Sequence, residues 1–123
     1  MLPRSESLIW DIAFHADFII ETTAEDDHWH SSSDSLTRHA VDRALQICSD
    51  RMISLEQTDP ACASTFTDST VLIGLRPKLV VARDGIDPND LRTFVDESVP
   101  RLFAESLIYI ELEPEWSDAE SVY

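Results

Sequence analysis

Apolar residues occupy every second position from Leu8 to Ile20, and several of the positions between them are charged or polar. Side chains of a β-strand point alternately to two faces, so this alternation is typical of a strand with one face against a core. It predicts a first strand over about residues 7–22, with a bulge or bend because most strands hold only about 3–10 residues. A helix is the alternative, but it would leave Trp10 and Phe14 outside its apolar stripe.

A polar segment follows at residues 23–35, and the apolar spacing then changes to that of a helix. Apolar residues three and four positions apart predict an amphipathic helix over about residues 35–55. Ser33, Asp34 or Ser35 would cap its first turn. The proline of Thr58-Asp59-Pro60 marks its end.

Short runs of apolar and β-branched residues return between residues 61 and 84, and they predict two or three strands. Asp68-Ser69 and Arg76-Pro77 are the turns expected between these strands. An aspartate followed by Pro88 then predicts the start of a second helix, which Pro100 should kink or split. Residues 107–112 form another apolar run and predict a final strand.

The predicted order is therefore β-α-β-β-α-β, which corresponds to a ferredoxin-like α+β fold with an antiparallel sheet and two helices on one face. Residues 1–113 would form this single domain, and residues 114–123 an acidic C-terminal tail. The other sheet face would be open and partly apolar, which favours a homo-oligomer or an interaction module. The alternative architecture is a small α+β dimer like those of secretion chaperones, and it requires the first segment to be a helix.

The chain of 123 residues has 24 acidic and 9 basic side chains, a net charge of −15 that is spread over both halves. A surface of this charge repels nucleic acid and anionic lipid, and it attracts proteins with basic patches. We therefore expect a protein partner with a basic surface, and neither direct nucleic-acid binding nor membrane binding. The charge is also compatible with a host whose cytoplasm is rich in salt.

We expect a cytoplasmic protein, by elimination. No stretch approaches the ~20 apolar residues of a membrane span, and the first residues do not resemble a secretory leader. The two cysteines, Cys48 and Cys62, are too few for a disulfide framework and are expected to be reduced thiols in the core.

One cluster could hold a metal ion. His28 and His30 would lie on the same side of an extended segment, beside Asp26 and Asp27 and with His15 as a further candidate ligand. Their spacing matches no established metal motif, so we expect a solvated loop here, with a metal-dependent enzyme as an alternative hypothesis. The chain has only two glycines, which argues against a loop that cradles phosphates. We thus expect no cofactor and no catalytic residue.

Aromatic residues next to carboxylates are the better candidates for function, because such rings can anchor a partner while the charges steer it. Trp29 lies in the polar segment, and Trp116 and Tyr123 lie in the acidic tail. The sequence predicts an acidic protein-binding module, a subunit, adaptor or inhibitor, and not an enzyme. An inhibitor that mimics nucleic acid is an alternative, supported by one short row of alternating acids, Glu111, Glu113 and Glu115.

Overall fold

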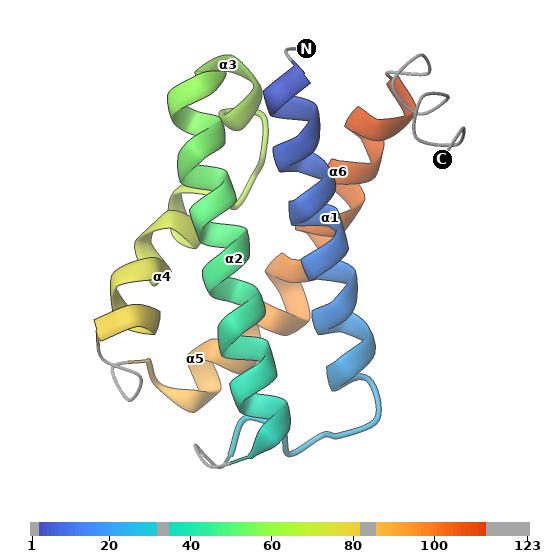
Figure 1. Ribbon diagram of the computed structural model, residues 1–123. Coiled ribbons are helices and arrows are strands. Elements are labelled where there is room, and N and C mark those ends of the chain that lie inside the picture. The colour runs from blue at the N-terminus through green and yellow to red at the C-terminus, as the bar shows by residue number, and fades with distance from the viewer. Residues whose placement is uncertain (1–2, 32–34, 82–85, 113–123) are drawn as a thin grey trace.

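The computed structural model describes residues 3–31, 35–81 and 86–112, which form a bundle of helices (Figure 1). Helix α1 packs against α2 on one side and α6 on the other, and α2 also packs against α4. The buried apolar side chains form one core between these helices. The elements are α1 (Pro3–Thr23), α2 (Leu36–Thr58), α3 (Pro60–Ala63), α4 (Ser69–Val81), α5 (Pro88–Thr93), the π-helical turn η2 (Phe94–Ser98) and α6 (Val99–Leu112).

The predicted ferredoxin-like α+β fold is wrong, because the described residues contain no strand. The regions predicted as the first and last strands are helical, residues 7–22 in α1 and residues 107–112 in α6. Most of the segment between residues 61 and 84 forms α3 and α4. The α+β dimer fails for the same reason, although the helix that it requires at the N-terminus is present. The predicted tail, residues 114–123, lies outside the described residues.

The strand prediction failed at α1 because this helix is apolar on two faces. Ile9, Ala13 and Ile19 interrupt the alternation of the sequence, and all three are buried on the inner face of the helix. Phe14 and Phe18 belong to a second, outer face. Two apolar stripes on one helix together fill nearly every second position, which imitates the pattern of a strand.

No helix among the described residues is both long and apolar enough to cross a membrane.

The helix predicted over residues 35–55 is confirmed as α2, and a side chain caps its N-terminus. The Ser35 hydroxyl accepts a hydrogen bond from the backbone N–H of Arg38 at 3.1 Å. At the other end, the backbone N–H of Asp59 donates to the Leu55 carbonyl at 2.7 Å. The Asp59 carboxylate also accepts from the Cys62 N–H at 3.2 Å, so one residue ends α2 and begins α3.

The helix predicted to begin at Pro88 is also confirmed, with the Asp87 carboxylate capping its first turn. The helical backbone continues from α5 through η2 into α6. Pro100 has no N–H to donate to the carbonyl four residues earlier, and the turn before it widens so that the Val99 N–H bonds to the Phe94 carbonyl. The expected disturbance at Pro100 is therefore a π-helical turn.

Helix α4 contains the Arg76-Pro77 pair that the sequence predicted as a turn. Leu72 and Leu79 lie two turns apart on this helix and are buried, while Arg76 forms an ion pair with Asp50 of α2. Packing against α2 therefore determines the conformation of this run of β-branched residues, whose local preference favours a strand.

Candidate partner-binding surface

The outer face of α1 carries a row of three aromatic residues, Trp10, Phe14 and Phe18, spaced four positions apart. Side chains at this spacing lie above one another on one side of a helix. Phe14 is 68% exposed and Phe18 is 40% exposed, whereas Ile12 and Ile19 on the inner face are fully buried. Exposed apolar patches on a folded domain commonly mark interaction sites, so the outer face of α1 is the first candidate for a partner-binding surface.

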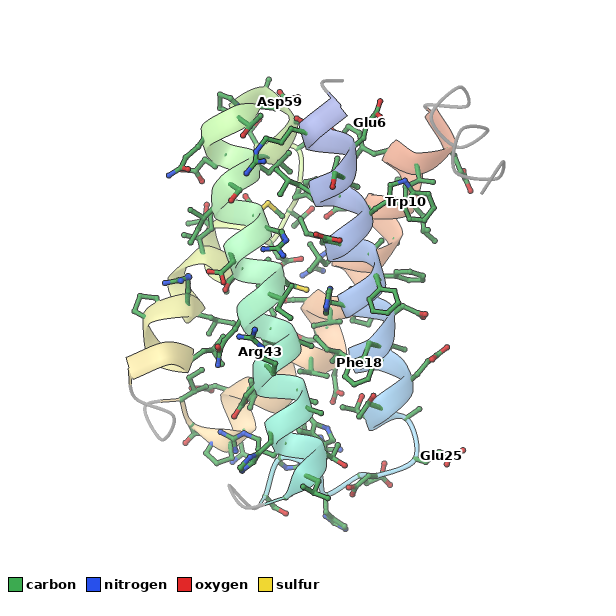
Figure 2. All side chains as sticks on the ribbon, viewed as in Figure 1. Glu6, Trp10, Phe18, Glu25, Arg43 and Asp59 are labelled. Atoms are coloured by element: carbon green, nitrogen blue, oxygen red, sulfur yellow. The ribbon has the colours of Figure 1, made fainter. Side chains whose placement is uncertain are left out.

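A shallow apolar groove of about 260 Å³ runs between α1 and α2. Phe18 and Arg43 lie on the face formed by these two helices (Figure 2). The His15 ring is held in place by a 2.7 Å contact between its Nδ1 atom and the Asp11 carbonyl, and it packs edge-on against Phe14. The groove is lined by Phe14, His15, Phe18, Ala40, Arg43, Ala44 and Ile47.

A second groove of about 200 Å³ lies between α1 and α6, and Phe14 forms a wall of both grooves. Trp10 projects from α1 towards α6 (Figure 2). The α6 side contributes Phe103, which is partly buried, and Leu107, which is 37% exposed. The second groove is lined by Trp10, Ala13, Phe14, Asp17, Phe103 and Leu107.

Helix α6 carries a further exposed apolar residue, Ile108, which is 53% exposed. Ile108 lines a further hollow together with Thr65, Glu105 and Tyr109. The Tyr109 ring stacks on Phe66, and its hydroxyl forms a hydrogen bond with Thr65. Exposed apolar side chains thus lie on both α1 and α6, at Phe14, Phe18, Leu107 and Ile108.

The structure describes two of the six predicted partner-binding residues, Trp29 and Glu111, and only Glu111 is exposed. Trp29 is only 3% exposed and belongs to the core, with its ring edge-on to His30. Glu111 is exposed near the end of α6. The other four, Glu113, Glu115, Trp116 and Tyr123, lie outside the described residues.

The histidines of the predicted metal cluster do not converge. His28 is exposed and His30 is buried, and the Asp26 carboxylate accepts a hydrogen bond from the His28 backbone N–H. The Arg38 guanidinium donates to the His30 carbonyl at 3.1 Å, which ties the loop to α2. Nowhere in the described part of the chain do three or more His, Cys, Asp or Glu side chains form a group suited to a metal ion.

The two cysteines are unpaired and buried, and their environment suppresses thiolate formation. Burial raises the pKa of the Cys48 thiol to about 12. Burial also raises the pKa of Cys62, which lies at the α3–α6 corner with Tyr109. Because the thiolate is the nucleophilic form, neither residue has the properties of a catalytic cysteine.

Sequence reasoning missed the outer face of α1, although the signal was present. Trp10, Phe14 and Phe18 recur every fourth residue, which is helical spacing, but the same residues also fit the alternation of a strand. The two grooves beside α1 could not be predicted, since they depend on α2 and α6 lying on either side of α1.

Comparisons with known proteins place this arrangement in no established group. No protein-family model, no curated protein and no solved structure matches the chain.

Proposed function

We propose that the chain is a protein-binding module, a subunit, adaptor or inhibitor without enzymatic activity, that engages a partner with a basic surface through the outer face of α1. The observation that carries this proposal is the aromatic row Trp10, Phe14 and Phe18, of which Phe14 and Phe18 are exposed and Trp10 is partly buried, on a helix whose inner face is already buried. Large exposed apolar patches on a folded domain commonly mark interaction sites.

The exposed parts of Phe14, Phe18, Leu107 and Ile108 add up to roughly 400 Å² if each side chain presents about 150–250 Å² in full. This is within the range of about 300–600 Å² for the largest apolar patch of a typical monomer, a patch that is often functional. The net charge of −15 selects the partner, because it speeds encounters with basic proteins and slows those with acidic ones.

We place this encounter in the cytoplasm, where unpaired buried thiols such as Cys48 and Cys62 stay reduced. No described residue favours the metal-dependent alternative. The alternative, an inhibitor that mimics nucleic acid, rests on Glu111 and on residues outside the described part of the chain. The capture experiment below distinguishes it from the proposal.

Affinity capture from an extract of the native host tests the proposal. Wild-type protein should retain a basic partner at low salt and lose it at high salt, and Phe14→Glu should fail to retain it. Val71→Glu is the matched control, since Val71 is 55% exposed on α4, away from α1. A partner retained equally by Phe14→Glu would refute this surface, and a partner displaced by duplex DNA would indicate mimicry.

A further inference from the structure

The two grooves beside α1 differ in charge. The groove between α1 and α2 includes His15 and Arg43 in its lining. The groove between α1 and α6 includes Asp17 and no basic residue among the six that line it. The two grooves therefore suit ligands of different charge. The α1–α6 groove suits a positively charged group.

Further acids flank the α1–α6 groove at both ends. Glu6 lies four residues before Trp10 and Glu21 lies four residues after Asp17, so each is one turn further along the groove side of α1. Glu111 lies one turn beyond Leu107 on α6. Because α1 and α6 run in opposite directions (Figure 1), Glu6 and Glu111 belong to the same end of the groove.

The size of the groove limits what can occupy it. Its volume of about 200 Å³ is below the roughly 300–1,000 Å³ of pockets that hold small molecules. Its exposed apolar area, mostly from Phe14 and Leu107, is on the order of 200–300 Å². A stable interface buries about 800 Å² on each partner, which is more than the apolar area of this groove. The groove is therefore large enough for one face of a single helix, and such a contact would be weak and transient.

A second copy of the chain is a poor occupant. A two-fold dimer places the same surface patch on both sides of the interface. Each copy would then bring its own Asp17, Glu21 and Glu111 against the acids of the other, and like charges at an interface repel.

We propose that the α1–α6 groove binds one amphipathic helix of the partner protein, with Lys or Arg residues on the flanks of its apolar face. Apolar residues at i, i+4 and i+7 of that helix fill the hollow between Phe14 and Leu107. Its basic flanks pair with Asp17 and Glu21 at one end and with Glu111 at the other. This inference rests on the proposed function and specifies the element of the partner that is recognised.

Three synthetic peptides of equal length test the inference. The first is an amphipathic Leu/Lys helix, the second has the same composition in scrambled order, and the third is an amphipathic Leu/Glu helix. Binding is followed by NMR chemical-shift mapping on the full chain. The first peptide should bind at least about tenfold more tightly than either of the others, with shifts concentrated on α1 and α6.

Two variants with the same change in charge separate the groove from the rest of the surface. Leu107→Lys alters a residue that lines the α1–α6 groove, and Val71→Lys alters a residue of α4 that lines neither groove. Both side chains are exposed, 37% and 55%. Leu107→Lys should weaken binding of the Leu/Lys peptide at least about tenfold, whereas Val71→Lys should change it less than about threefold. Asp17→Asn should reduce the salt dependence of binding.

The inference is overturned if the scrambled peptide binds as well as the amphipathic one, or if Val71→Lys causes the larger loss. It is also overturned if light scattering shows a dimer that Leu107→Lys dissociates, since the occupant would then be a second copy. Capture of the host partner that is lost with Phe14→Glu and kept with Leu107→Lys would uphold the proposed function and refute this inference alone.

Discussion

Paired substitutions at Ile9 and Phe14 test which face of α1 is buried. Ile9 is fully buried, and replacing a buried isoleucine with alanine costs about 2–5 kcal/mol. Phe14 is 68% exposed, so only about 60 Å² of its surface is covered, worth about 1.5 kcal/mol at about 25 cal/mol per Å². Glutamine keeps part of this contact and favours a helix, so Phe14→Gln should cost less than about 1 kcal/mol.

Urea unfolding followed by circular dichroism at about 222 nm measures both costs. Ile9→Ala should lower the free energy of unfolding by about 2–5 kcal/mol and the melting temperature by roughly 8–20 °C. Phe14→Gln should remain close to wild type, with the same dependence on urea concentration. A comparison of midpoints is valid only where that dependence is unchanged.

A strand over residues 7–22 predicts the opposite order. Phe14 would then share the core face with Ile12, and its substitution would cost about 3–5 kcal/mol, while Ile9 would lie on the open face and cost little. A greater loss for Phe14→Gln than for Ile9→Ala would therefore refute the helical assignment of α1 and the outer face that depends on it.

Three further predictions concern pH, capping and helix propensity. Burial raises the pKa of Cys48 from 9.0 to about 12, so between these values the unfolded chain releases a proton that the folded chain keeps. The free energy of unfolding should fall with rising pH in this range by about 1.4 kcal/mol per pH unit. Between about pH 8 and 10 the urea midpoint should fall less for Cys48→Ala than for wild type. Ser35→Ala should lower the free energy of unfolding by about 1 kcal/mol and Ser35→Asp should preserve it, because the side chain accepts from the Arg38 N–H; equal losses would contradict the cap. Gly74→Ala should raise it by about 0.5–1 kcal/mol, because a methyl group there meets nothing within 4 Å, and a loss on urea unfolding would contradict this.

The sequence predicted those elements whose signals are local. The helix at residues 36–58 has one apolar stripe and a serine cap, and the helix at Pro88 begins with an aspartate that caps it. Neither signal depends on the rest of the chain. Both elements were therefore predictable from short windows of sequence.

The elements that were wrong depend on tertiary packing. Helix α1 is sandwiched between α2 and α6, and α4 lies along α2, so both carry apolar residues on more than one side. In such segments hydrophobic periodicity no longer separates a helix from a strand. Trp29 was predicted to bind a partner from a polar segment, but its side chain is buried in the core, and this too depends on tertiary packing.

Photo-crosslinking inside cells of the native host can show whether the outer face of α1 meets a partner. A photoreactive amino acid is placed at position 14, at position 107 or, as a control, at position 71, where the native side chains are all exposed. Positions 14 and 107 should form an adduct with the same basic protein, and position 71 should not. Adducts from position 71 alone, or none from position 14, would contradict the claim that the outer face of α1 meets the partner.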